Sequence, residues 1–231
     1  MISLIQENSI EMTDIPVRKY LLESFYTVGQ LPNHDKIKPL LHQLIDDAPA
    51  DSLKENDDYY TDSVQKLDWA AAKDFTRPWT VSFKPSLDNY LNELAIALGY
   101  QKAIIEELWF QQYGNGDTHG WHTHGSNFTG VYYLELDGAS PKTEIIEPSK
   151  QDKKMTPDVR EGDVLIFPSY TIHRAPVITD QIRKTIISFN FIFDLIDEDT
   201  LTRISVTTSA ARAASVRRAG PRCPGRSRWK A

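Results

Sequence analysis

Four of the six histidines of this 231-residue chain lie in two short segments that could together bind one metal ion. His119, His122 and His124 occur in THGWHTHG, and His173 occurs in SYTIHRAPV. Side chains two residues apart in a β-strand point to the same face, so His122 and His124 can reach one ion together. We expect His173, from a distant strand, to complete the set. An HxH pair alone is more often a surface or packing feature, so the prediction depends on its surroundings.

The segment around His173 adds a second chemical group, Arg183, ten positions further along the chain. Gly162 and Asp163 predict a turn before a short buried strand, with His173 just beyond that strand. An unpaired charge in a protein core is costly, so a buried arginine opposite a metal needs a partner. A guanidinium can bind a carboxylate through two parallel hydrogen bonds. We therefore expect Arg183 to bind the far carboxylate of a dicarboxylate that chelates the metal, a surface arginine being the alternative.

The chain resembles the 2-oxoglutarate and Fe(II)-dependent oxygenases, and more narrowly those of marine phages and bacteria. The resemblance lies in the combined pattern HxxHxH, GVYYL, GD, FPS, H, R and SFN. The resemblance is clearest from Glu107 to Phe193. It implies an all-β double-stranded β-helix (jelly roll) core with flanking helices, a non-haem Fe(II) centre, 2-oxoglutarate as cosubstrate and O2. The implied reaction is hydroxylation of an unidentified substrate with release of succinate and CO2.

Similarity to the prolyl hydroxylases of this superfamily implies a role for individual residues. The implied catalytic metal ligands are His122, His124 and His173. The implied 2-oxoglutarate contacts are the Arg183 clamp, the Tyr133 hydroxyl on the same carboxylate, Thr185 beside them and Tyr113 near the chelating end. For Tyr113 and Tyr133, simple packing in the core is an equally good interpretation, because aromatic residues in strands usually fill the core.

One position departs from the superfamily, whose usual metal site has two histidines and one carboxylate. The carboxylate position is His124 in this chain. Either three neutral imidazoles bind the iron, or a carboxylate from elsewhere replaces one of them, with Glu144 and Asp117 as the candidates. We favour His124.

Two other functions remain open on the sequence. GDVLIFPSYTIH and HTH also match the motifs of cupins, which would make the protein a metal-dependent enzyme without 2-oxoglutarate. A non-enzymatic jelly-roll binding protein with vestigial histidines is the second alternative. Arg183 and Tyr133 favour the oxygenase over the cupin, which has no use for a dicarboxylate clamp at this place.

The patterns along the chain predict one catalytic domain in three parts. Residues 1–100 are expected to be a mostly helical support, with helices over 37–45 and over 87–98, the latter capped by Ser86 and ended by Gly99. Residues 50–63 have no period and predict a loop or flap. Residues 101–200 are expected to form the β-helix core, with short strands at 104–113, 127–136, 143–148, 163–170 and 184–193.

The last residues of the chain and its overall charge bear on which partners the protein can bind. Residues 201–231 predict a basic tail that is either disordered or a frameshifted, non-native reading. Net charge is −6, and eight basic residues follow Asp199, which leaves 18 basic against 32 acidic residues before them. Such an acidic body argues against nucleic acid as a partner.

Cys223 is the single cysteine, so a thiolate-rich metal site is excluded. No run is long and apolar enough for a membrane span or a signal peptide, so we expect a cytoplasmic protein, in the host cytoplasm if phage-encoded. The expected partners are the small-molecule cosubstrate and an unknown primary substrate, and a homodimer is left open.

Overall fold

The computed structural model describes residues 22–56, 61–150, 152–196 and 199. The predicted basic tail lies outside these residues. In the part of the chain so described, no helix is both long and apolar enough to cross a bilayer.

Strands dominate the described chain, and every strand pair is antiparallel. A seven-stranded sheet has the order β1-β9-β6-β11-β4-β3-β2, and a four-stranded sheet has the order β5-β10-β7-β8. The strands of the larger sheet are β1 (Thr27–Gln30), β2 (Asp51–Asn56), β3 (Thr61–Leu67), β4 (Tyr100–Tyr113), β6 (Phe128–Glu135), β9 (Asp163–Pro168) and β11 (Lys184–Ile196). Those of the smaller sheet are β5 (His119–His122), β7 (Glu144–Ile146), β8 (Lys154–Met155) and β10 (His173–Ala175).

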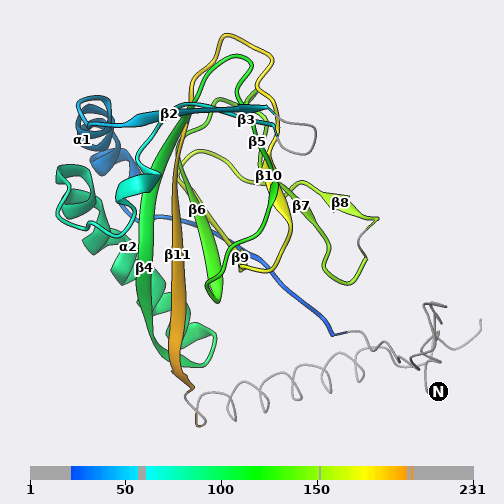
Figure 1. Ribbon diagram of the computed structural model, residues 1–231. Helices are drawn as coiled ribbons and strands as arrows, with labels where there is room; N and C mark the ends of the chain where they lie inside the picture. Colours follow the sequence, from blue (N-terminus) through cyan, green and yellow to red (C-terminus); the bar gives the residue numbers. More distant parts are fainter. Residues whose placement is uncertain (1–21, 57–60, 151, 197–198, 200–231) are drawn as a thin grey trace, which may run out of the picture.

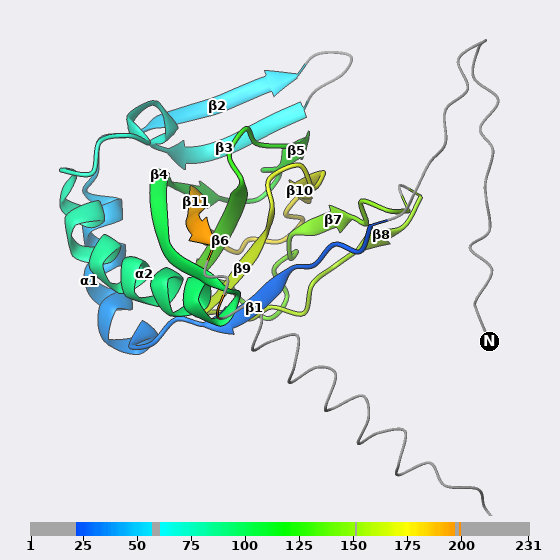
Figure 2. The same ribbon diagram turned by 90° about the horizontal axis from the view of Figure 1, so that it is seen from below.

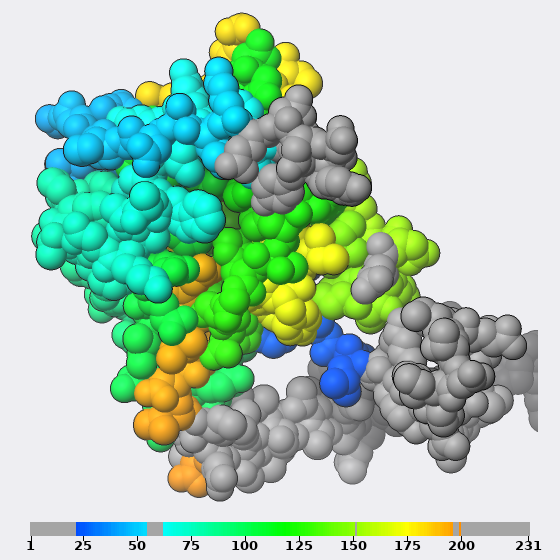
Figure 3. Space-filling model, viewed as in Figure 1, coloured from blue at the N-terminus to red at the C-terminus, as the bar shows by residue number. Residues whose placement is uncertain are grey.

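The two sheets form a double-stranded β-helix, as predicted, and the helices α1 (His34–Asp46) and α2 (Pro78–Ala97) cover the outer face of the larger sheet (Figures 1 and 2). A short 3-10 helix, η1 (Trp69–Ala71), leads into α2. In the space-filling view, α2 in teal lies against the green strands, and α1 in blue lies above α2 (Figure 3).

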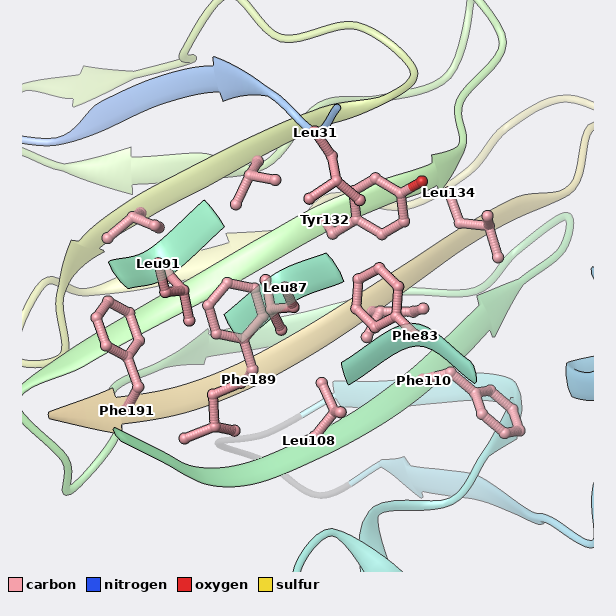
Figure 4. Packing of buried hydrophobic residues seen from close by; sticks show 14 of the residues in the cluster. Leu31, Phe83, Leu87, Leu91, Leu108, Phe110, Tyr132, Leu134, Phe189 and Phe191 are labelled. Carbon is pink, nitrogen blue, oxygen red and sulfur yellow. The ribbon is translucent and has the colours of Figure 1, made fainter. Parts of the chain in front are cut away.

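The outer face of the larger sheet is apolar because α2 presents one buried side to it. Phe83, Leu87 and Leu91 are four residues apart, so they lie on one side of the helix, and all three are fully buried. They pack against Tyr132 of β6 and Phe189 of β11 (Figure 4). Alternate residues of the same strands point the other way, into the space between the two sheets.

Two predictions for the first hundred residues are wrong. The second helix begins at Pro78, eight residues before the expected cap Ser86, because Pro78 can take the first helical position, where its missing N–H costs nothing. It ends before Gly99, as predicted, where the φ angle of 87° suits glycine. Residues 50–63 are not a loop: Asp51–Asn56 and Thr61–Leu67 pair as the β2–β3 hairpin and extend the larger sheet beside β4.

Candidate metal centre

Three histidines meet between the two sheets. His122 ends β5 and lies directly opposite His173, the first residue of β10. His124 follows β5 and is held by its backbone N–H, which donates to the Ser169 carbonyl at 3.0 Å. One ring nitrogen from each of the three histidines lies within 4.8 Å of the others, so a single metal ion could contact all three. The structure therefore brings together the three predicted ligands.

Two of the three rings are held in the protonation form that a metal needs. His122 Nδ1 lies 2.7 Å from the Gly120 carbonyl, and His173 Nδ1 lies 2.9 Å from the Thr171 carbonyl. A carbonyl only accepts, so both Nδ1 atoms carry the proton and both Nε2 atoms have a free lone pair. Hydrogen bonds of this kind fix the ring orientation of metal-binding histidines.

The surroundings also keep the three imidazoles neutral. Burial lowers the pKa of His124 to about 4 and lowers the pKa of His122 and His173 as well. The neighbouring imidazoles act in the same direction on His124 and His173, because two adjacent cations repel. Neutral imidazole is the form that binds a metal.

His124 is less well supported than the other two. Its Nε2 lies 3.3 Å from His173 Nε2, and its Nδ1 lies 3.5 Å from the amide nitrogen of Asn190. That amide nitrogen donates to Glu107 at 2.7 Å, and the amide oxygen accepts from Thr129 at 3.0 Å, so the amide faces His124 with its N–H group. Among the described residues, His124 Nδ1 therefore has no acceptor to hold its proton.

The structure places neither alternative carboxylate in this cluster. Glu144 is bound by Lys154 at 2.6 Å and by Arg174 at 2.7 Å. Asp117 accepts from the Ser63 hydroxyl at 2.6 Å and from the Gly114 N–H at 2.7 Å, and so closes the turn before β5. Both carboxylates are already paired.

The prediction of a buried Arg183 facing the metal is wrong. Its side chain is 44% exposed, donates to Glu135 at 2.8 Å and lies near Asp46 at the end of α1. Thr185 lies on the same side of the strand and donates to Glu135 at 2.9 Å. Arg183 immediately precedes β11, and because it shares the acceptor Glu135 with Thr185, both lie on the outer side and neither faces the histidines.

The residue between them, Lys184, points inward and was missed from the sequence. It is 1% exposed, and its ammonium lies 5.0 Å from the Tyr113 ring centroid. Its acceptor among the described residues is the Pro141 carbonyl, at 3.0 Å, and no carboxylate there pairs with it. Burial lowers the pKa of Lys184 to about 8. The alternation of Ser188 and Asn190 with the phenylalanines of β11 could have identified its inward direction.

The two predicted tyrosines do lie inside. Tyr113 and Tyr133 are both buried in the apolar cluster between the sheets. Tyr133 donates to the Thr143 hydroxyl at 2.7 Å, not toward Arg183. The enclosed Tyr113 hydroxyl has no hydrogen-bond partner of ordinary geometry within the described chain. Burial raises the pKa of both phenols, so both stay protonated and can donate.

A cleft of about 290 Å³ opens beside two of the three histidines, His122 and His124. Its walls are mostly apolar, with Trp69 and Trp109 on η1 and β4 and with Leu53 and Leu67 on the β2–β3 hairpin. His122 and His124 form part of its lining, so a molecule in the cleft would touch the proposed metal ligands. A narrower cavity runs from the histidines between the sheets toward Tyr113 and Thr143.

In sequence, the core of this chain is similar to a family of oxygenases. Residues 107–190 match the sequence model of a family described as "Putative 2OG-Fe(II) oxygenase". The matched segment contains the three histidines and Lys184. Comparison with curated proteins gives no match.

Solved structures share the fold at low sequence identity. A prolyl-4-hydroxylase from Pseudomonas putida is 11% identical, with a TM-score of 0.53 over 74% of this chain and 94% of the other. A prolyl hydroxylase from Trichoplax adhaerens, solved with a hypoxia inducible factor peptide, is 14% identical, with a TM-score of 0.52 over 76% and 84%.

An α-ketoglutarate-dependent epimerase of nogalamycin biosynthesis, SnoN, is 12% identical, with a TM-score of 0.55 over 74% and 79% of the two chains. Because these structures of similar fold include an epimerase as well as hydroxylases, the fold does not decide the outcome of the reaction. The resemblance of this chain to the 2OG-Fe(II) oxygenases is confirmed for its β-helix core, residues 107–190.

Proposed function

We propose that this protein is an Fe(II) and 2-oxoglutarate-dependent oxygenase that hydroxylates its substrate, with His122, His124 and His173 as iron ligands and Lys184 as the residue that binds the far carboxylate of 2-oxoglutarate. Lys184 takes the role that the sequence assigned to Arg183. The observation that carries the proposal is the buried Lys184 ammonium, which has no carboxylate partner among the described residues and lies in the same interior as the three convergent histidines.

The spacing along β11 supports this arrangement. The inward residues Ser188, Ile186 and Lys184 lie opposite Trp109, Gln111 and Tyr113 of β4 in register. Trp109, Gln111, Ile186 and Ser188 line the narrow cavity beside the histidines. Each step of two residues moves about 7 Å along a strand, so Lys184 lies deeper than the histidine cluster.

A dicarboxylate fits the chemistry of this interior. An ammonium without an anionic partner is costly in a core, and a carboxylate would compensate that cost. The Tyr113 hydroxyl is a second enclosed donor beside Lys184. A cupin needs neither group, so these two residues favour the oxygenase over the cupin.

When bound, iron and 2-oxoglutarate would allow O2 to oxidise the substrate, with one oxygen atom entering the hydroxylated product, the other entering succinate, and CO2 released. The chain's own residues hold and shield these groups. His122 and His173 present fixed nitrogen lone pairs, Lys184 neutralises the far carboxylate, and the apolar walls of the cleft exclude water from the reacting C–H bond.

His124 is proposed as the third ligand because no carboxylate joins the cluster in the described part of the chain. Three imidazoles leave both charges of Fe(II) to be balanced by the cosubstrate, so we expect weak iron affinity without 2-oxoglutarate. His124→Asp should retain iron, whereas His124→Ala should lose about 10- to 100-fold in affinity. Retention of full affinity in His124→Ala would remove His124 from the ligand set.

The direct test of the proposed function is an anaerobic absorption spectrum followed by product analysis. The full chain with Fe(II) and 2-oxoglutarate should show the weak visible charge-transfer band of a chelated iron, and admission of O2 should then yield succinate. His173→Ala is the control that should abolish both signals. A band-free spectrum at saturating iron and cosubstrate would reject the oxygenase and leave the cupin or the binding protein.

A further inference from the structure

The β2–β3 hairpin lies outside the matched segment but contacts the metal centre through one buried carboxylate. Asp62 of β3 is 3% exposed. One of its oxygens accepts from the Gly120 N–H at 2.7 Å, and the other lies 3.7 Å from His119 Nε2. Gly120 and His119 lie in β5, two and three residues before the proposed ligand His122.

The orientation of His119 follows from its other neighbours. The Ser188 hydroxyl donates to the oxygen of the Gln111 amide at 3.1 Å, so the amide nitrogen faces His119 Nδ1, at 3.3 Å. An amide nitrogen only donates, so Nδ1 is the acceptor and the proton of His119 lies on Nε2, which faces Asp62. His119 Nδ1 thus accepts a hydrogen bond and Nε2 faces the Asp62 carboxylate, and His119 is not one of the three convergent ligands.

His119 and Gly120 in turn hold His122. The His119 ring stacks on the His122 ring, with centroids 3.9 Å apart and planes at 18°. The Gly120 carbonyl is the acceptor for His122 Nδ1. Two contacts of the His122 ring therefore come from residues that Asp62 contacts. Such supporting hydrogen bonds commonly change metal affinity 10- to 100-fold.

We infer that Asp62 and His119 are positioning residues which, through Gly120 and the stacked rings, fix the His122 ring for metal binding. The β2–β3 hairpin then supports the geometry of the metal centre and also forms a wall of the cleft. This inference rests on the proposed function only in taking His122 as a metal ligand.

The chain offers a matched control in Asp117. Like Asp62, Asp117 is a buried carboxylate that binds one backbone N–H beside β5, but its side-chain partner is Ser63 and not a histidine. Asp117→Ala should therefore destabilise the same region without disturbing His122. Any effect of Asp62→Ala that Asp117→Ala lacks belongs to the metal centre.

The experiment is a titration of Co(II) into the full chain, followed by its visible d–d bands, together with thermal unfolding of each apo protein. We expect about one Co(II) per parent chain, a 10- to 100-fold loss of affinity and altered bands in Asp62→Ala, and parent-like affinity and bands in Asp117→Ala. If Asp62→Ala does not fold, Asp62→Asn replaces it. Its amide can still accept from Gly120 but sets an N–H against that of His119, so we expect about a tenfold loss.

The outcomes separate the two claims. A folded Asp62 variant with parent-like Co(II) affinity and bands overturns the positioning role and leaves the proposed function standing. An equal loss in Asp117→Ala also overturns it, because a general weakening of the region would then explain both. Absence of stoichiometric Co(II) binding by the parent chain instead contradicts the proposed metal centre.

Discussion

The two faces of the seven-stranded sheet are built from alternate residues of the same strands, yet their chemistry differs. The outer face of β11 carries Ile187, Phe189 and Phe191, all in the helix-covered core. The inner face of the same strand carries Lys184, Ser188 and Asn190, which are buried but polar. One face buries apolar area against α2, and the other holds hydrogen-bonded and charged groups around the histidines. The comparison shows that alternate residues of one strand can serve different purposes: those on one face stabilise the fold, and those on the other face line the candidate site.

The largest effect should come from the outer face. Phe189→Ala would leave a cavity between β11 and α2, and we expect it to lower the free energy of unfolding by about 3 to 5 kcal/mol. Denaturant unfolding measures this loss. In protein that remains folded, Co(II) affinity should stay within about threefold of the parent, because Phe189 faces away from the metal centre. A selective loss of metal binding without loss of stability would break the separation between the faces.

Removal of a charged side chain from the inner face should instead raise the free energy of unfolding. Lys184 has a pKa of about 8 in the folded protein against an ordinary value of 10.5, a difference of roughly 3 kcal/mol against burying its charge. That cost is fully present below about pH 8 and disappears as pH rises toward the unfolded value. Lys184→Met should therefore raise the free energy of unfolding at about pH 7, by up to roughly 3 kcal/mol.

Arg183→Met is the matched control for Lys184→Met. Arg183 immediately precedes the same strand and is exposed, so its ion pairs should contribute only about 0 to 1 kcal/mol. Denaturant unfolding of both variants compares the two faces directly. A clear destabilisation by Lys184→Met would show that the Lys184 ammonium is paired in the folded protein.

The smallest expected effect is a pH dependence of cosubstrate binding. Only protonated Lys184 attracts a carboxylate, so 2-oxoglutarate affinity should be flat below about pH 8 and fall up to tenfold per pH unit above it. Calorimetric titration across this range measures the slope. Lys184→Arg keeps its charge at higher pH and should remove the decline. A decline that persists unchanged in this variant would assign the titration to another group.

Much of the fold follows from local patterns in the sequence. The β-branched and aromatic runs predicted the core strands β4, β6, β7, β9 and β11, and those strands are confirmed. The β2–β3 hairpin was not predicted because Asp51–Asn56 is polar and pairs only at the edge of the sheet. The early start of α2 was missed because Trp79 and Phe83, which continue its buried side, precede the expected cap.

The parts of the candidate site that depend on the spacing of residues along the chain were predicted correctly. The parts that depend on which face of a strand a side chain occupies were not. The HxH pair and the distant histidine do meet, as their spacing indicated. The buried basic residue is Lys184, one position after the predicted Arg183, and a shift by one residue reverses the face of a strand. Asp62 could not be linked to the site at all, because only the tertiary fold brings it beside His119.

The most direct test of the central claim is a titration of 2-oxoglutarate into the anaerobic Fe(II) protein, made with the parent, Lys184→Met and Arg183→Met. A charge-assisted hydrogen bond of roughly 1.5 to 3 kcal/mol corresponds to about a 10- to 100-fold change in affinity. We predict that loss for Lys184→Met and a change of less than about twofold for Arg183→Met, with iron affinity preserved in both. Cosubstrate binding that survives Lys184→Met but is lost in Arg183→Met would contradict the account.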